Sequence, residues 1–136
     1  MMTLSRLEEL IEKALGVDRE VAMRHLDLWD YYAPYYMLMH YLVKELDPCV
    51  AVELGVDKGR ACKSMLFAAS SNSRIIGVDS RRDLGIAALQ EVFPIFTFVE
   101  AASCPVPGEI PENIDILHID TLHTYTQAKA EFEAYE

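Results

Sequence analysis

The sequence predicts an α/β fold in which a parallel sheet of four strands follows a helical N-terminal segment. The apolar spacing changes at Asp47-Pro48, from a helical period before this dipeptide to short apolar runs after it. The runs alternate with helical stretches, a pattern typical of parallel strands joined by right-handed crossovers. The runs at 75–78 and 116–119 are close to continuously apolar, as strands are when both faces of a sheet are covered.

The helical segment, residues 1–47, predicts three helices. Apolar side chains recur at helical spacing from Leu4 to Leu15 and predict the first helix. Asp18 can cap a second helix. Pro34 fits the first turn of a third helix over residues 34–45, which the Asp-Pro dipeptide would end.

Residues 48–136 predict the sheet domain. The expected strands are 49–54, 74–79, 95–100 and 114–120, and the expected helices are 59–70, 82–92 and one that begins near Thr124. Thr124 and Gln127 form a T-x-x-Q capping box at the start of that last helix. We expect its inward face to consist of Ala128, Phe132 and Tyr135.

The predicted sheet is Rossmann-like, with strand order 3-2-1-4, so the fourth strand lies at an edge. An apolar edge strand favours association with another chain. The sequence also stops within the last predicted helix. Two explanations remain open: the chain is a piece of a longer domain, or a second copy covers the edge. On this basis we expect a homo-oligomer, most simply a dimer.

Composition and charge argue against several classes of partner. The chain has 12 basic and 22 acidic residues and a net charge of −10, which disfavours nucleic acid and anionic membranes. Its cysteines, Cys49, Cys62 and Cys104, suggest neither a disulfide framework nor a zinc site. No apolar run is long enough to cross a bilayer, and the N-terminus does not resemble a signal peptide. We therefore expect a cytoplasmic protein.

The segment 50–60 predicts a nucleoside-binding turn at the end of the first strand. An apolar strand leads to Glu53, and Gly55 and Gly59 bracket the turn before the next helix. Asp57 occupies the place of the second glycine of a dinucleotide fingerprint. A carboxylate at a helix N-terminus would repel a phosphate. The turn therefore favours a phosphate-free nucleoside such as S-adenosylmethionine and disfavours a nicotinamide-dependent oxidoreductase.

Three motifs resemble those of class I S-adenosylmethionine-dependent methyltransferases. They are Val52-Glu53-Leu54-Gly55-Val56-Asp57-Lys58-Gly59-Arg60, Gly77-Val78-Asp79, and His118-Ile119-Asp120-Thr121-Leu122-His123-Thr124-Tyr125. The last contains an I-D-x-x-H-x-Y signature that resembles the branch of macrolide sugar O-methyltransferases and cephalosporin hydroxylase-like proteins. The resemblance covers residues 50–136 and implies a chain that stops after the family's fourth strand.

The resemblance implies a set of cofactor-binding residues. Glu53, Gly55 and Gly59 would bind the methionine part of the cofactor, with Glu53 near its ammonium group. Asp79 would accept hydrogen bonds from both ribose hydroxyls, although it could instead cap the helix that follows Arg81. The family contacts the adenine after the third strand, where Ser103 and backbone groups would have to serve because Ala101 and Ala102 replace the usual residues.

The resemblance also implies catalytic residues at the end of the fourth strand. Asp120 would be a magnesium ligand, and His123 would be the base for an acceptor hydroxyl. One carboxylate cannot supply the oxygen ligands that magnesium needs, and the family's other acids come from beyond its fifth strand. The alternative is that Asp120 caps the last helix and His123 is an ordinary loop residue. We expect His118, inside the strand, to be a packed histidine.

An aromatic cluster precedes the predicted sheet. It consists of Trp29, Tyr31, Tyr32, Tyr35 and Tyr36, which could line an acceptor pocket or belong to the core or a subunit interface. The sequence thus predicts methyl transfer to a hydroxyl of a small molecule, a sugar or natural product. The alternative is a truncated, non-catalytic domain of the same fold that binds the cofactor or oligomerises.

Overall fold

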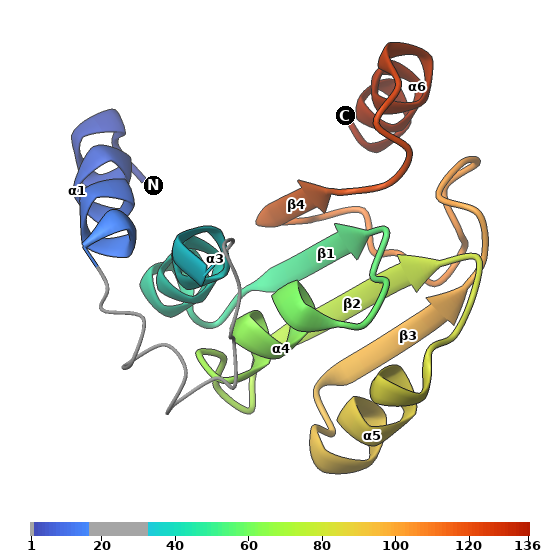
Figure 1. The fold of residues 1–136 in the computed structure, drawn as a ribbon, viewed down its shortest axis with the longest axis horizontal. Helices are drawn as coiled ribbons and strands as arrows, with labels where there is room; N and C mark the ends of the chain where they lie inside the picture. The colour runs from blue at the N-terminus through green and yellow to red at the C-terminus, as the bar shows by residue number, and fades with distance from the viewer. Residues whose placement is uncertain (1, 17–32) are drawn as a thin grey trace.

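A computed structural model describes residues 2–16 and 33–136 of the chain. Four parallel strands form one sheet in the order β3-β2-β1-β4, which confirms the predicted order. The strands are β1 (Val50–Leu54), β2 (Arg74–Asp79), β3 (Phe96–Glu100) and β4 (Ile116–Ile119). All four arrowheads in Figure 1 point to the same side of the molecule, so the loops after the strands share one rim of the sheet.

Five helices are described. They are α1 (Leu4–Leu15), α3 (Ala33–Leu46), α4 (Arg60–Leu66), α5 (Leu84–Val92) and α6 (Tyr125–Tyr135). Hydroxyl or carboxylate side chains cap three of them: Thr3 for α1, Asp83 for α5 and Thr124 for α6. The predicted helix beginning at Asp18, together with Trp29, Tyr31 and Tyr32, lies outside the described residues. None of the described helices is long and apolar enough to cross a membrane.

Helix α4 ends at Leu66, four residues before the end predicted from the sequence. The carboxylate of Asp47 explains the early end, because its Oδ1 accepts hydrogen bonds from the Ser70 backbone N–H at 2.8 Å and from the Ser73 hydroxyl at 2.6 Å. These hydrogen bonds hold the loop before β2 in a non-helical path. They also lower the pKa of Asp47.

The sheet divides the core into two apolar layers. On one face, Ala51 and Ile75 belong to the same cluster as Met39 and Val43 of α3 and Met65 of α4. On the other face, side chains of β1, β2 and β3 pack against the loop after β3 and against α6, through Val52, Leu54, Ile76, Val78, Val99, Ile110 and Tyr135. Both faces are therefore covered, as the apolar strands predict.

Helix α1 contacts α3 and stands apart from the sheet (Figure 1). Ala14 packs against Met37. The guanidinium of Arg6 also forms two hydrogen bonds to the carboxylate of Glu45, at 2.9 and 2.7 Å. Because Val43 of α3 is fully buried in the main core, α3 joins α1 to the sheet.

The predicted inward face of α6 is wrong at two of its three positions. Ala128 and Phe132 are exposed, and Phe132 exposes 61% of its surface. The side chains that face the protein are Gln127, Glu131 and Tyr135. Tyr135 alone was expected there. The reason is that this part of α6 lies over polar loops at the rim of the sheet, and these loops supply hydrogen-bond donors.

Strand β4 lies at the edge of the sheet and pairs with β1 within the described residues. In their register Glu53 is opposite His118, and Leu54 is opposite Ile119. This pairing brings the predicted cofactor turn after β1 and the predicted catalytic loop after β4 together at the same rim. The expected homo-oligomer stays a prediction.

Candidate functional site

The turn after β1 lies directly against the end of β4. Gly55 has a φ of +84°, which favours glycine. Its N–H donates to the Val78 carbonyl at 2.8 Å, and the Asp120 N–H donates to the Leu54 carbonyl at 2.8 Å. A Cβ on Gly55 would lie 2.1 Å from the Asp120 carbonyl oxygen. Only glycine therefore permits the strand ends to approach this closely.

The carboxylate of Asp79 holds this turn from the end of β2. Its Oδ2 accepts hydrogen bonds from the N–H groups of Val56 and Asp57, at 2.9 and 3.0 Å, and its Oδ1 accepts one from Arg81 at 3.1 Å. A carboxylate oxygen accepts about two hydrogen bonds, so Oδ1 retains room for one more donor. Asp79 does not cap α5, because Asp83 does so. Its predicted contact to both ribose hydroxyls stays a prediction.

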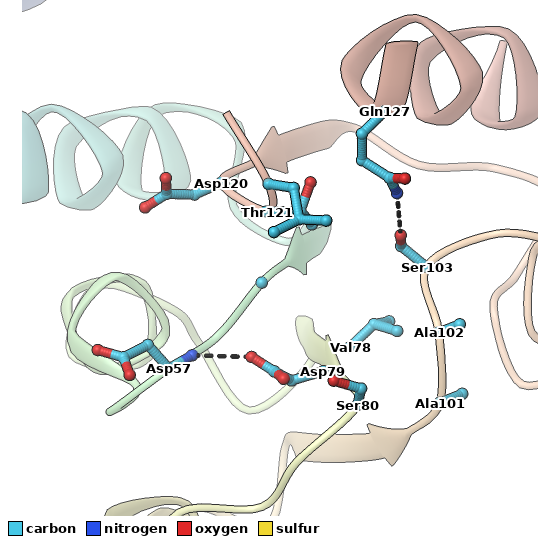
Figure 2. Close-up of a pocket in the computed structure, with 12 residues that line it drawn as sticks. Asp57, Val78, Asp79, Ser80, Ala101, Ala102, Ser103, Asp120, Thr121 and Gln127 are labelled. Carbon is cyan, nitrogen blue, oxygen red and sulfur yellow. Dashed lines mark hydrogen bonds between the residues drawn. The ribbon is translucent and has the colours of Figure 1, made fainter. Parts of the chain in front are cut away.

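The main cavity, of about 400 Å³, opens at the carboxyl ends of the strands (Figure 2). Its lining comes from the loops after β1, β2, β3 and β4 and from the first turn of α6: Gly55, Asp57, Val78, Asp79, Ser80, Ala101, Ala102, Ser103, Asp120, Thr121, Leu122 and Gln127. Three of these residues are aspartates, and none is lysine, arginine or histidine. Among the described residues, the lining therefore favours a cation and disfavours a phosphate.

Two further cavities adjoin the main one. A cavity of about 390 Å³ is lined by Tyr35, Tyr36, Asp120 and His123. A smaller one, of about 80 Å³, lies between Tyr36 and the turn after β1, and its lining includes Glu53, Asp120, Lys58 and Arg60. Asp120 borders all three cavities, so this residue lies where they meet.

Asp120 and His123 form the pair that the sequence predicts. His123 Nε2 lies 3.3 Å from Asp120 Oδ1, and the His123 side chain is 85% exposed. Thr124 caps α6 by accepting a hydrogen bond from the Gln127 N–H, so Asp120 is not the helix cap. The aspartate is therefore free to face a ligand, and His123 is open to solvent on the side of the second cavity.

The predicted magnesium site does not fit the described residues. They contain no group of three His, Cys, Asp or Glu side chains that could hold a metal ion. Within the described part of the chain, the ion-pair partner of Asp120 is His123, whereas magnesium prefers several oxygen ligands in octahedral geometry. We therefore derive no step of the reaction through a metal.

Glu53 lies in a buried chain of polar groups beneath the second cavity. It is 2% exposed, and its Oε2 accepts a hydrogen bond from the Cys62 thiol at 2.7 Å. His118 Nδ1 lies 3.2 Å from Glu53 Oε1, although the two are not aligned for a hydrogen bond. His118 Nε2 contacts the hydroxyl of Tyr35. His118 is thus packed within the strand, as predicted, and it links Glu53 to a wall of the second cavity.

This polar chain shifts the pKa of two of its members. Burial, with the nearby Glu53 carboxylate, raises the pKa of the Cys62 thiol well above its ordinary value. Burial, with the carboxylates of Asp120 and Glu53, raises the pKa of Tyr35 to about 12. Both groups are therefore neutral at neutral pH, and the Tyr35 hydroxyl carries a proton that it can donate.

Glu131 of α6 is a site residue that the sequence did not reveal. It is completely buried, and its carboxylate accepts hydrogen bonds from Ser103, Thr121 and Gln127 at 2.5, 2.7 and 2.8 Å. Burial works to raise its pKa, but the three hydrogen bonds outweigh burial, and the pKa lies below the ordinary value. Tyr135 adds a hydrogen bond to the Ser103 carbonyl at 3.0 Å. Glu131 thus fixes one wall of the main cavity.

A family model described as a methyltransferase domain matches residues 52–136. The chain belongs to this methyltransferase family. A comparison with curated proteins found no match. Among solved structures, the chain is similar to a protein from Pyrococcus horikoshii described as an RNA methyltransferase, with 20% identity and a TM-score of 0.48. The likeness covers 88% of this chain and 59% of that chain, so this chain spans less than two thirds of that protein's length.

The family implies S-adenosylmethionine as the cofactor of its members. The main cavity fits such a ligand, because carboxylates and no basic side chains line it. The structure places Gly55, Asp79, Ser103 and Asp120 around this cavity. Glu53 borders the small cavity beside it, and His123 borders the second large cavity. Gly59 lines none of the three; its role is to let the turn pack under Ile86 and Leu89 of α5.

Proposed function

We propose that this methyltransferase transfers a methyl group from S-adenosylmethionine to a hydroxyl of a small molecule, such as a sugar or another natural product. The observation that carries the proposal is the position of Asp120 where the two large cavities meet, with His123 beside it in the second. Methyl transfer needs a donor and an acceptor in line. Two adjoining cavities suit two adjoining reactants.

Three carboxylates, two in the main cavity and one beside the small cavity, orient the cofactor in this proposal. S-adenosylmethionine supplies an electrophilic methyl group on a positively charged sulfur. Asp120 favours positive charge where the cavities meet, and Asp79 offers the remaining acceptor site of Oδ1 to a ribose hydroxyl. Glu53 borders the small cavity, which Lys58 and Arg60 also line, and we assign it to the ammonium group of the cofactor.

His123 acts as the general base in this proposal. Histidine is the side chain that most often serves as a general base, and its Nε2 lies 3.3 Å from Asp120 Oδ1. As the bond between oxygen and the methyl carbon forms, the carbon–sulfur bond breaks and sulfur keeps the electron pair. His123 takes the hydroxyl proton. Tyr35, whose hydroxyl stays protonated, lines the acceptor cavity and contacts His118 Nε2.

The I-D-x-x-H-x-Y signature supports a sugar-like acceptor, through the resemblance of residues 119–125 to sugar O-methyltransferases. The net charge of −10 supports a small molecule over a nucleic acid. Two tyrosines, Tyr35 and Tyr36, line the acceptor cavity. Aromatic rings with a polar edge suit a ligand that has both hydroxyls and apolar faces.

Calorimetry with S-adenosylhomocysteine tests the cofactor site, and a mass-spectrometric assay tests transfer. The assay would combine S-adenosylmethionine with a panel of monosaccharides, glycosides and phenols. We expect wild-type protein and His123→Ala to bind S-adenosylhomocysteine equally. We expect His123→Ala to lose at least about 100-fold of any transfer activity. Lys129→Ala, on the exposed side of α6, is the matched control and should retain full activity.

The outcomes separate the proposal from its alternative. Transfer that survives His123→Ala at the wild-type rate would show that His123 is not the base. Tight binding of S-adenosylhomocysteine without transfer to any acceptor would favour a non-catalytic domain that binds the cofactor. If S-adenosylhomocysteine fails to bind at millimolar concentration, the proposed cofactor site is wrong.

A further inference from the structure

The second cavity brings two aromatic side chains and a carboxylate together. Its lining consists of Tyr35, Tyr36, Asp120 and His123, and its volume of about 390 Å³ is in the usual range for small-molecule sites. Among the described residues, its lining contains neither lysine nor arginine. Aromatic surface combined with negative charge suits an organic cation.

Tyr35 presents its ring to this cavity. The Tyr35 hydroxyl contacts Nε2 of His118, and His118 is buried. Tyr35 nevertheless exposes 40% of its surface. Because the hydroxyl is turned toward the buried histidine, the accessible part of the side chain is its ring.

The ring of Tyr36 lies beside that of Tyr35 in a different orientation. The two ring centroids are 5.9 Å apart, and the ring planes meet at 65°. Both residues line the cavity, so a ligand there meets two aromatic side chains at an angle to each other. The faces of such rings attract ammonium groups, and quaternary ammonium ligands are recognised in this way.

The carboxylate of Asp120 adds a negative charge on the same side. Its Oδ1 lies 3.3 Å from Nε2 of His123, a residue that lines the second cavity and not the main one. In Figure 2 the Asp120 side chain points away from the wall that Ser103 and Gln127 form. Burial and then the charge of Asp120 raise the pKa of Tyr35, as expected when the carboxylate is near the tyrosine.

This carboxylate needs a positive partner when the reaction begins. Among the residues that the structure describes, its ion-pair partner is His123. A general base must be neutral before it takes a proton. In the proposed reaction His123 therefore cannot balance the charge of Asp120 at that stage, whereas a cation on the acceptor can.

We propose that the acceptor is an organic cation, a sugar or other natural product with a positively charged amino group close to the hydroxyl that is methylated. The ammonium group lies against the rings of Tyr35 and Tyr36, with Asp120 as its counter-ion. This inference rests on the proposed function for the hydroxyl and for methyl transfer. The cation site itself can be tested without transfer.

The test compares two ligands of the same shape that differ in charge. Choline carries a quaternary ammonium group and a hydroxyl, whereas 3,3-dimethyl-1-butanol has carbon in place of the nitrogen and is neutral. NMR titrations are made on protein saturated with S-adenosylhomocysteine, which keeps the main cavity filled. We expect the wild type to bind choline at least about tenfold more tightly than the neutral alcohol.

Substitutions separate the ring from the hydroxyl and from the charge. Tyr35→Phe keeps the ring and should keep the preference for choline. Tyr35→Leu removes the ring and Asp120→Asn removes the charge, and each should reduce the preference to about threefold or less. Tyr125→Leu and Glu133→Gln are the matched controls, because both residues are exposed on α6 and line none of the three cavities. Both should keep the wild-type preference.

Circular dichroism would confirm that each variant is folded. Tyr35→Leu also loses the contacts of the tyrosine with His118. If that variant does not fold, Tyr36→Leu tests the contribution of the rings and should lower the preference to the same degree.

A transfer assay gives a second readout. The acceptor panel described above would be extended with the amino-substituted counterpart of each compound. We expect kcat/KM for an amino compound to exceed that of its neutral counterpart by at least about tenfold.

Each result has a distinct meaning. If the wild type binds choline and the neutral alcohol equally, the inference is wrong while the cofactor site stands. The inference is also wrong if S-adenosylhomocysteine displaces choline, or if the folded ring and charge variants keep the full preference. A neutral acceptor that reacts as fast as its amino counterpart would support the proposed function and overturn the inference.

The opposite combination is equally clear. If choline is preferred through these residues but no compound is methylated, the cation site stands and the proposed function does not. If S-adenosylhomocysteine fails to bind, the proposed cofactor site is wrong, and the choline preferences of the variants still decide the cation site.

Discussion

Two buried carboxylates stand behind the walls of the two large cavities, and they are held in different ways. Glu53 on β1 is 2% exposed and lies among a thiol and an imidazole. Glu131 on α6 is 0% exposed and accepts three hydrogen bonds, from two hydroxyls and an amide. Both acids are buried, but only Glu131 has several strong hydrogen-bond donors around it.

The difference shows that a buried glutamate can have two different roles, depending on its hydrogen-bond partners. A buried carboxylate with several neutral donors is stabilised in its charged form. Glu131 therefore holds its three hydrogen-bond partners in place and makes this wall of the main cavity rigid. Glu53 has one weak thiol donor and a histidine beside it. Through His118, its surroundings reach Tyr35 in the acceptor cavity.

The largest expected effect comes from a substitution that forces apart the ends of β1 and β4, where the turn after β1 contacts Asp120. In Gly55→Ala the new Cβ would lie 2.1 Å from the Asp120 carbonyl oxygen, at a φ of +84°. We expect a loss of about 3 kcal/mol or more in the free energy of unfolding, from overpacking and backbone strain. Urea denaturation followed by circular dichroism measures it. Gly108→Ala is the control, because nothing lies within 4 Å of its added Cβ, and a large loss there would contradict the steric argument.

The next effect compares the two acids directly. Glu131→Gln replaces an acceptor of three hydrogen bonds with a group that must point a donor at other donors, and should cost about 2–3 kcal/mol of unfolding free energy. Glu53→Gln should cost less than about 1 kcal/mol. Glu53 accepts one weak hydrogen bond, from the Cys62 thiol, and the amide oxygen of glutamine can accept that bond instead. Equal losses in urea denaturation would show that the two acids are held alike.

The strand order and the positions of the turn residues were predictable from the sequence. Alternating apolar runs and helical stretches specify parallel strands, and parallel strands end at a common rim. Gly55, Asp79 and Asp120 each come at the end of a strand, so their convergence on one cavity follows from the fold class alone.

The surroundings of the two buried acids, Glu53 and Glu131, could not be predicted from the sequence in the same way. Helical periodicity predicts which face of a helix is apolar, but α6 turns a polar face inward. The sequence therefore led us to expect Phe132 to be buried, whereas the buried residue is Glu131. The only sequence signal was the capping box, which puts Gln127 one turn before Glu131. The contact of Glu53 with His118 depends on the register of β1 and β4, which apolar patterning leaves open.

The two regions should also differ in how acid changes the free energy of unfolding, although this effect is smaller than those above. The folded pKa of Glu131 lies below its ordinary value of 4.5, so the folded state binds the proton less readily than the unfolded state. The stability that Glu131 contributes is therefore present above pH 4.5 and is lost as the pH falls through the folded pKa.

Unfolding free energies measured between pH 3 and 7 should fall less steeply below about pH 4.5 in Glu131→Gln than in the wild type. Asp47 and Glu45 also have lowered pKa values, so the readout is the difference between the two proteins and not the slope of either one. Parallel curves would contradict the assignment of the shift to Glu131.

The smallest expected effect is that of Tyr35, which lies at the far end of the polar chain formed by Glu53 and His118. Tyr35→Phe removes the hydroxyl that contacts His118 Nε2 and should cost about 1 kcal/mol of unfolding free energy. Tyr125→Phe is the control, since Tyr125 is 81% exposed, and should stay within about 0.5 kcal/mol. Because Tyr35 lines the acceptor cavity and not the main one, its variant should bind S-adenosylhomocysteine within about twofold of the wild type. A larger loss of affinity would mean that the two cavities, and the two buried acids behind them, are coupled.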